Sequence, residues 1–224
     1  MGLLLGGHGS GKSLLLQVFA RQLRQRGCRL ALVNLQGLEP LDLLGQIAVQ
    51  LGANPGRGDT LSGLWRRLGD RVVELRYEDQ QAVVLLDDAH AAADRVLSAT
   101  LRLVQLARTT GAALTLVLSS ADGAAASLPG SAEALLDLAA LRIDLDPWEA
   151  NDTAEYLRTA LEKAGCRVDL FAPSAVERLH ELGMGVPRRI SQLADLALLA
   201  AAGQELSQLD GDTVDSVHRA LAVV

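Results

Sequence analysis

Residues Gly6 to Ser13 read Gly-Gly-His-Gly-Ser-Gly-Lys-Ser, a spacing suited to holding phosphate groups. Glycines let successive backbone N–H groups turn toward one anion, and the lysine adds a positive charge at the same place. The serine hydroxyl can ligate a magnesium ion that accompanies the phosphates. The eight residues satisfy the Walker A, or P-loop, pattern, for which an ordinary glycine turn is the alternative interpretation.

The expected ligand of this segment is ATP with Mg²⁺. We expect the Lys12 ammonium on the β- and γ-phosphates and the Ser13 hydroxyl on the metal. A helix that begins near Lys12 would add the positive end of its dipole. The residues predicted to bind the nucleotide are therefore Gly6, Gly7, His8, Gly9, Ser10, Gly11, Lys12, Ser13 and Leu14.

A pair of carboxylates follows a second apolar run, Val83 to Leu86. Such a run indicates a buried strand, and ligands gather at the carboxyl ends of strands in open α/β sheets. We assign Asp87 to the magnesium ion, through water, and Asp88 to orienting or deprotonating the attacking water. The alternative for Asp88 is that it only caps the following helix.

The elements that must position these residues alternate along the first part of the chain. Short apolar runs predict strands, and the periodic segments between them predict helices, which together favour a parallel sheet covered on both faces. The expected strands are Gly2 to Gly6, Arg29 to Asn34, Ala82 to Asp87, Ala112 to Ser119 and Leu141 to Leu145. The expected helices are Lys12 to Arg26, Pro40 to Leu51, Leu61 to Asp79 and Ala92 to Thr110.

Only helices are expected after Asp146, which predicts a nucleotide-binding domain over residues 1–146 and a helical subdomain over residues 147–224. Pro173 and Pro187 can each occupy a first helical turn. Two pairs have capping-box spacing, Asp152 with Glu155 and Ser174 with Glu177. The expected helices are Asp152 to Ala164, Pro173 to Leu182, Pro187 to Ala202 and Asp212 to Ala222.

Composition limits the classes of function. The chain has 224 residues, of which 49% are hydrophobic, and a formal net charge of −6. A large core is therefore expected, and strong autonomous binding to nucleic acid is not indicated. Cys28 and Cys166 lie far apart, so neither a zinc site nor a disulfide framework is predicted. No apolar run reaches the roughly 18–20 residues of a membrane span, and we expect a reduced, cytoplasmic protein.

The sequence Asp87-Asp88-Ala89-His90 resembles the DEAH-type Walker B of AAA+ ATPases of the general secretion pathway protein A (ExeA-like) type, with an ORC-type AAA domain. The resemblance covers nearly the whole chain. It implies a five-stranded parallel sheet of strand order 5-1-4-3-2 and a C-terminal helical lid. The second acid of that family is usually Glu, so Asp88 has a shorter reach, which bears on the rate of hydrolysis rather than on nucleotide binding.

The same resemblance implies further site residues. The segment Gly185 to Ile190 is similar to the family's sensor 2, which makes Arg188 the sensor arginine; a solvated basic turn formed with Arg189 is the alternative. Two arginines at a helix start also oppose the positive end of the helix dipole, where acidic residues are favoured. A residue placed against such a local preference often marks a functional site. Sensor 1 is expected at the end of the fourth strand, with Ser120 preferred over Ser119. Asn34 matches a polar residue that restrains the catalytic acid, or it is a turn former.

Two family features are not found. No arginine finger is evident before the last strand, since Arg142 lies too far into it. Only five residues precede Gly6, where related proteins carry a segment that helps to cover the adenine, which implies either a truncated start or weak recognition of the base.

The leading hypothesis is an ATPase, slow by itself, whose hydrolysis of ATP to ADP and phosphate moves the lid and a partner. The resemblance implies assembly of a secretion or pilus apparatus, with a protein partner or a homo-oligomer, and membrane contact only through a partner or a further segment. The alternatives are a regulatory nucleotide-binding module with little hydrolysis and a helper ATPase for DNA transposition or replication origins. A small-molecule kinase also has a P-loop, but the acid pair and Arg188 disfavour it.

Overall fold

The computed structural model describes residues 1–111, 114–121, 130–166 and 169–221. The chain divides into two compact units, which are described separately here. The first comprises Met1–His8 and Lys12–Leu145, and the second comprises Asp146–Val224 together with Gly9–Gly11.

The first unit is built on one sheet of five parallel strands in the order β2-β3-β4-β1-β5. Read from the β5 edge, this is the expected order 5-1-4-3-2. The strands are β1 (Gly2–Gly6), β2 (Arg29–Asn34), β3 (Ala82–Asp87), β4 (Leu114–Ala121) and β5 (Leu141–Leu145). β4 runs two residues beyond the expected Ser119 because it stays paired with β1 as far as Gly6. Ala112 and Ala113, expected at its start, lie outside the described residues.

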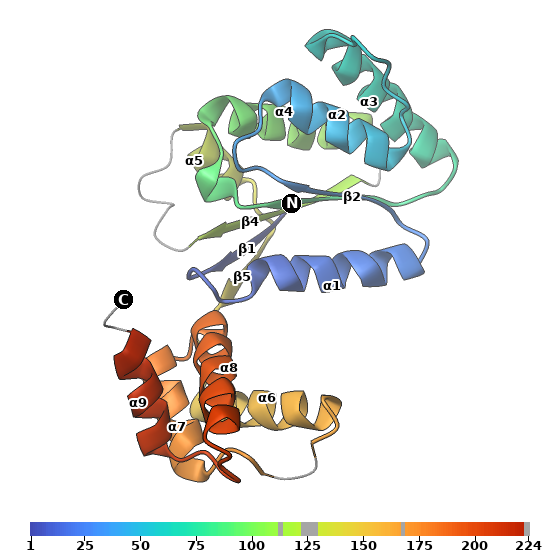
Figure 1. Cartoon of the computed structure of the whole chain (residues 1–224). Coiled ribbons are helices and arrows are strands. Elements are labelled where there is room, and N and C mark those ends of the chain that lie inside the picture. The colour runs from blue at the N-terminus through green and yellow to red at the C-terminus, as the bar shows by residue number, and fades with distance from the viewer. Residues whose placement is uncertain (112–113, 122–129, 167–168, 222–224) are drawn as a thin grey trace. The chain divides into compact units, whose positions relative to one another are not determined.

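Helices cover both faces of the sheet, as Figure 1 shows. On one face lies α1 (Lys12–Gln25), because Leu4 of β1 packs with Leu16 and Ala20 of that helix. Leu3 and Leu5 point to the opposite face, as alternation along a strand requires, and join a second and larger core cluster. That face is covered by α2 (Pro40–Leu51), α3 (Leu61–Tyr77), α4 (Asp94–Thr110) and α5 (Gly130–Asp137).

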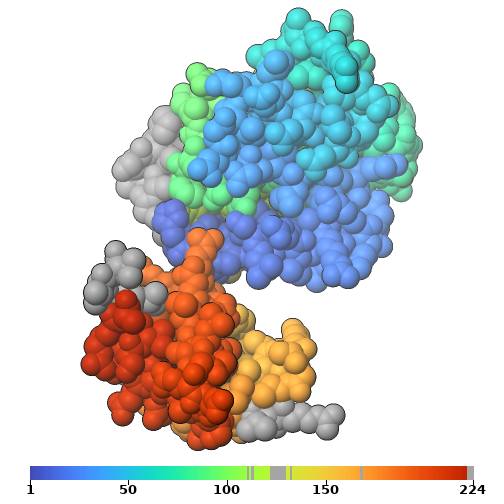
Figure 2. Space-filling model, viewed as in Figure 1, coloured from blue at the N-terminus to red at the C-terminus, as the bar shows by residue number. Residues whose placement is uncertain are grey.

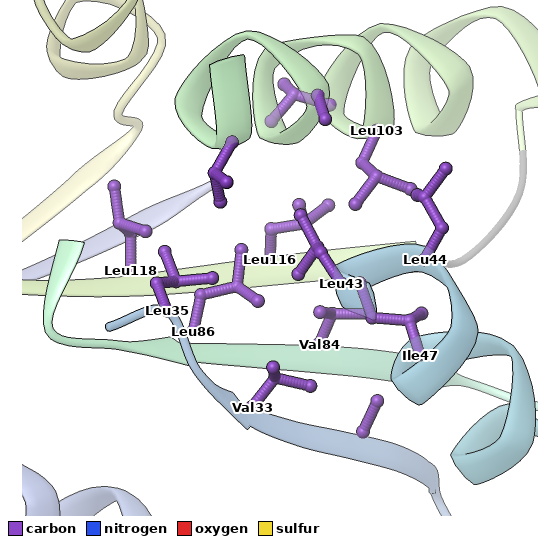
Figure 3. Packing of buried hydrophobic residues seen from close by; sticks show 14 of the residues in the cluster. Val33, Leu35, Leu43, Leu44, Ile47, Val84, Leu86, Leu103, Leu116 and Leu118 are labelled. Carbon is purple, nitrogen blue, oxygen red and sulfur yellow. The ribbon is translucent and has the colours of Figure 1, made fainter. Parts of the chain in front are cut away.

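The larger cluster is centred on α2 and the middle strands (Figure 3). Leu43, Leu44 and Ile47 of α2 are fully buried against Val84 and its strand neighbours. Burying one such side chain contributes roughly 1.5–3 kcal/mol, so this cluster supplies much of the unit's stability. The helix is bounded as its sequence favours, by Pro40 in the first turn and by Gly52 in the left-handed conformation at its end (φ 80°).

The outer edge of β2 is closed by a side chain of α2. The Gln50 amide accepts a hydrogen bond from Leu32 N at 3.0 Å and donates one to Leu32 O at 3.1 Å. These are the two backbone groups that an added strand would use, so Gln50 blocks pairing at this edge of the sheet.

Replacing Gln50 with Ala is expected to destabilise the first unit by about 1–2 kcal/mol, because two hydrogen bonds to the backbone of Leu32 are lost. Urea unfolding followed by circular dichroism measures the change. Gln46→Ala removes the same side chain one turn earlier on α2, where no described hydrogen bond uses it, and serves as the control. Equal stability of the two variants would contradict the edge-closing role of Gln50.

The second unit is helical, as expected after Asp146. It contains α6 (Ala150–Lys163), α7 (Pro173–Gly183), α8 (Pro187–Gly203) and α9 (Gly211–Leu221). α8 presents a stripe of buried residues spaced by three or four positions, and these pack with α7, α9 and the segment around Phe171. The core of the unit comprises Leu157, Phe171, Ala175, Leu179, Leu193, Ala194, Ala197, Ala201, Leu209 and Val214. Ala222, expected at the end of α9, lies outside the described residues.

The capping boxes expected in this unit are wrong. α6 starts at Ala150, two residues before Asp152, so Asp152 is the third helical residue of a capping box whose first member is Glu149. α7 starts after Ala172, because Pro173 occupies the first turn, and Ser174 lies inside the helix. The Ser174 hydroxyl instead accepts a hydrogen bond from Gly211 N at 3.3 Å.

The first residues of the second unit are fastened to the start of α8. Trp148 N donates to Gly185 O at 2.8 Å, and a Cβ at Gly185 would lie 2.5 Å from Trp148 O. The Trp148 ring lies 5.0 Å from the Tyr156 ring, and the Tyr156 hydroxyl donates to Ser191 Oγ on α8. Gly185 is also in the left-handed region (φ 67°), so only glycine suits this position.

Candidate functional site

The predicted site residues of the first unit lie at one edge of the sheet. All five strands are parallel, so their carboxyl ends meet at the same edge. Asn34 ends β2 and Asp87 ends β3, while the P-loop follows β1. Ser119 lies near the end of β4. The sheet therefore gathers residues from four separate segments.

The P-loop has the backbone that its glycines permit. Gly9 and Gly11 take positive φ angles of 82° and 95°, which other residues rarely adopt. Lys12 is buried, with 7% of its surface exposed, and its Nζ donates to Gly6 O at 2.7 Å and to Gly7 O at 2.9 Å. The Ser10 hydroxyl is buried with no hydrogen-bond partner among the described residues. A buried ammonium and an unsatisfied hydroxyl in one loop suit an anionic ligand.

The first turn of α1 carries the remaining P-loop residues. Ser13 is partly buried, and Leu14 is 64% exposed. The helix begins at Lys12, so its first N–H groups and the positive end of its dipole belong to the loop that would hold phosphates.

Asp87 is held by a network at the end of β3. Its Oδ1 accepts hydrogen bonds from the Ser119 hydroxyl and from Asp88 N, the latter at 3.1 Å. Its side chain is 7% exposed. No described residue donates to Oδ2, so one oxygen of the carboxylate is fixed by the protein while the other keeps its capacity to accept from a metal-bound water.

Asp88 contacts Asn34 rather than the helix that follows it. Asn34 Nδ2 donates to Asp88 Oδ2 at 2.8 Å, and Asn34 Oδ1 accepts from Gln36 N at 2.8 Å. Asp88 lies in the left-handed conformation (φ 57°, ψ 46°), and its side chain makes no capping hydrogen bond to η1 (Ala89–Ala91). The geometry therefore favours the site interpretation of Asp88 over the capping one.

Ser119 contacts the acid pair at the end of β3, whereas the sequence preferred Ser120 over Ser119 for sensor 1. Ser119 Oγ contacts Asp87 and also accepts from Asp88 N at 3.2 Å. Ser120 points to the other face of the sheet, where it lines a small apolar pocket with Leu97 and Leu118 and its hydroxyl has no partner among the described residues. The reason is the alternation of side chains along β4.

His90 is a site residue to which the sequence reasoning gave no role. Its Nδ1 accepts a hydrogen bond from Ala121 N at 3.3 Å, and its ring lies edge-on to the P-loop residue His8, with centroids 5.1 Å apart. His90 thus links the end of β4 to the P-loop. Its position three residues after Asp87, on η1, was the available signal.

Arg188 and Arg189 belong to the second unit, as the second and third residues of α8 after Pro187. Both side chains are exposed, and neither guanidinium forms an ion pair with a described residue. The residues that could hold ATP and Mg²⁺ are thus the P-loop with Lys12, Ser13 for the metal, and Asp87 through water. Because magnesium keeps several waters and phosphate oxygens as ligands, one protein hydroxyl and one water-mediated carboxylate fit it.

Comparison with known proteins settles the family. A model of the AAA domain family matches residues 1–124, more than half of the chain. The chain belongs to the AAA domain family. The AAA domain therefore includes the P-loop, Asp87 and Asp88, and Ser119. AAA+ ATPases as a family bind ATP with Mg²⁺.

One curated relative of this AAA domain is general secretion pathway protein A of Aeromonas hydrophila, which is 29% identical over 203 residues. The match covers 89% of this chain but 36% of that protein, so the chain spans about a third of the relative's length.

Solved structures show the same fold. Cdc6p from Pyrobaculum aerophilum has a TM-score of 0.69 and 22% identity, over 93% of this chain and 57% of that one. Aeropyrum pernix ORC2 has a TM-score of 0.69 and 18% identity, over 96% and 60%. The Thermotoga maritima RuvB Holliday junction branch migration motor has a TM-score of 0.67 and 14% identity, over 98% and 61%. At these identities the likeness establishes the AAA+ fold alone.

Within the described ranges, no helix of this AAA protein is both long enough and apolar enough to cross a membrane.

Proposed function

We propose that this AAA domain protein is a slow Mg²⁺-dependent ATPase. The observation that supports the proposal best is the pairing at the sheet edge: Asp87 offers one carboxylate oxygen toward a metal, and Asp88 lies beside it with its carboxylate held by Asn34. One group would bind Mg²⁺ through water and the other would orient or deprotonate the attacking water.

The remaining roles follow from position. The Lys12 ammonium would exchange the carbonyl oxygens of Gly6 and Gly7 for the β- and γ-phosphates, and Ser13 would ligate the metal. Ser119 would act as sensor 1 through its hydrogen bond to Asp87. Asn34 would hold Asp88 away from the water until a partner docks. Residues 1–146 would form the nucleotide-binding domain and residues 147–224 the lid.

Phosphate release from ATP, with and without Mg²⁺, tests the proposal. A slow rate that depends on Mg²⁺ is expected. ATP binding without measurable release would instead favour a regulatory module, a second candidate that the Asn34–Asp88 hydrogen bond supports because it occupies the catalytic acid.

We further propose that turnover rearranges the lid and a protein partner. Similarity to general secretion pathway protein A supports a partner in a secretion or pilus apparatus, in the cytoplasm. The RuvB and ORC structures support a DNA-associated role as an alternative, but the net charge of −6 disfavours direct contact with a phosphate backbone.

Arg188→Ala is expected to lower the affinity for a non-hydrolysable ATP analogue by about tenfold to a hundredfold and to change ADP affinity much less. A guanidinium directed to the terminal phosphate contributes only when that phosphate is present, and one charge-assisted hydrogen bond is worth roughly 1.5–3 kcal/mol. Calorimetric titrations of the analogue and of ADP measure both affinities.

Arg189→Ala is the matched control, since Arg189 is the adjacent arginine of the same helix and is equally unpaired among the described residues. A selective loss in Arg189→Ala alone would shift the sensor by one residue. No selective loss in either variant would make the arginine pair an ordinary solvated helix start.

A further inference from the structure

The two outer edges of the sheet differ in whether a side chain occupies their backbone hydrogen-bonding groups. The β2 edge is closed by the Gln50 amide, which occupies both Leu32 N and Leu32 O. At the opposite edge, four residues of β5 are exposed and Leu145 is half-buried. Half of the N–H and C=O groups of an edge strand face away from its only neighbour, so β5 can accept another strand.

The side chains of β5 alternate in a self-complementary pattern, Leu-Arg-Ile-Asp-Leu. Leu141 and Ile143 are 59% and 45% exposed. Arg142 and Asp144 lie on the other face and form a surface ion pair at 2.9 Å. The apolar face is on the α1 side of the sheet, because Ile143 is in register with Leu4. On that side of the sheet, α1 carries four exposed apolar residues, Leu14, Leu15, Val18 and Phe19. Figure 2 shows the blue N-terminal part of the chain at the surface of the first unit.

We propose that β5 is a homodimerisation strand, which pairs antiparallel with β5 of a second copy of this chain around a two-fold axis at Ile143. In that register Arg142 lies opposite Asp144 of the other copy, and Asp144 lies opposite its Arg142. Leu141 faces Leu145 of the other copy on the apolar side. Every cross-strand pair is then of matching chemistry, as a two-fold symmetric interface requires.

Only this register matches the charges. A shift of one residue places Arg142 opposite an apolar residue, since neighbouring residues point to opposite faces. A shift of two residues places Arg142 against Arg142 or Asp144 against Asp144, and like charges directly opposite one another destabilise a strand pair. The charges that deter pairing with an arbitrary strand therefore favour a second copy of this strand.

Antiparallel pairing also separates the points at which the two chains leave the paired strands. The chain leaves β5 toward the second unit after Leu145, and the two copies of Leu145 lie at opposite ends of the paired strands. The expected dimer is weak, with a dissociation constant on the order of 100 µM, because a five-residue strand pair buries less than the roughly 1,600 Å² of a standard interface.

Sedimentation velocity of the full chain from about 10 µM to about 1 mM tests the proposal, since this range spans the expected dissociation constant. A reversible monomer–dimer equilibrium is expected. Arg142→Asp and Asp144→Arg should each weaken it by about tenfold or more, because both cross-strand pairs become repulsive. The double variant Arg142→Asp, Asp144→Arg should restore it, and an equimolar mixture of the two single variants should form heterodimers.

Arg29→Asp, which makes the same charge change on the closed β2 edge, is the matched control and should dimerise like wild type. Monomeric wild type at about 1 mM, or single variants that dimerise as well as wild type, would overturn the proposal. So would a folded double variant, judged by circular dichroism, that stays monomeric. If a variant does not fold, hydrogen exchange on the wild-type protein tests whether β5 is the interface. The amides of β5 should gain protection from exchange as the protein concentration rises. Unchanged protection in a sample that dimerises would place the interface elsewhere.

Discussion

Lys12→Ala is expected to lower the affinity for ATP with Mg²⁺ at least a hundredfold. The ammonium is buried in the P-loop and donates at 2.7 Å and 2.9 Å to two loop carbonyls, so it is already aimed into the loop that would surround the phosphates. Two charge-assisted hydrogen bonds to phosphate are worth roughly 3–6 kcal/mol together, and 1.4 kcal/mol corresponds to tenfold in affinity. Isothermal titration calorimetry measures the loss.

Lys163→Ala is the control, because Lys163 is exposed near the end of α6 and is the other lysine of the chain. Circular dichroism of Lys12→Ala should show an intact fold. Equal ATP affinities of wild type and Lys12→Ala would contradict the assignment of the P-loop as the phosphate-binding segment.

Asp88→Asn is expected to reduce phosphate release by about a hundredfold to ten-thousandfold while leaving ATP affinity nearly unchanged. Loss of a positioned general base typically costs this much, and Asn keeps both the size of the side chain and its tolerance of the left-handed backbone. Single-turnover phosphate release and calorimetry measure the two quantities. An unchanged rate would leave Asp88 with a structural role only.

Asp79→Asn is a closely matched control for that experiment. Asp79 is also in the left-handed conformation, with φ 52° against 57° for Asp88, and lies just beyond α3 at the start of the segment leading to β3. The same chemical change at the same backbone geometry should leave the rate intact there.

Asp88→Glu tests whether the length of the side chain or the backbone conformation at residue 88 limits hydrolysis. The longer arm should raise the rate if the short side chain of Asp88 limits hydrolysis. Glu tolerates the left-handed region less well than Asp, at a cost of roughly 1 kcal/mol in stability, so thermal unfolding should be measured alongside the rate.

Local patterns were enough to predict most of the elements. β3 is an apolar run ended by two carboxylates, and α2 begins at a proline and ends before Gly52, so both agree with their predicted bounds. α5 was missed because it has eight residues, too few for a helical period to emerge, and of its described side chains only Leu135 is fully buried. η1 was missed for the same reason, and α4 consequently starts at Asp94 rather than Ala92.

The site was predictable in its parts but not in its contacts. The P-loop residues form one continuous motif, so their types alone pointed to phosphate. The Asn34–Asp88 hydrogen bond joins residues 54 positions apart, and Ser119 meets Asp87 across 32 positions. The choice between Ser119 and Ser120 depends on the register of β4 against β3, which pairs Leu86 with Leu118 and which no local pattern contains.

The fastening of Trp148 to Gly185 makes Trp148 and the start of α8 one rigid body. Trp148 N is hydrogen-bonded to Gly185 O, two residues before α8, and the Trp148 ring packs on Tyr156, whose hydroxyl donates to Ser191. The start of α8 therefore turns with Trp148 as one body. Just before Trp148 the backbone is restricted as well. Pro147 fixes its own φ and holds Asp146 in an extended conformation, so few soft torsions remain. The backbone that carries Arg188 is therefore stiff from Pro147 through Trp148 to the start of α8.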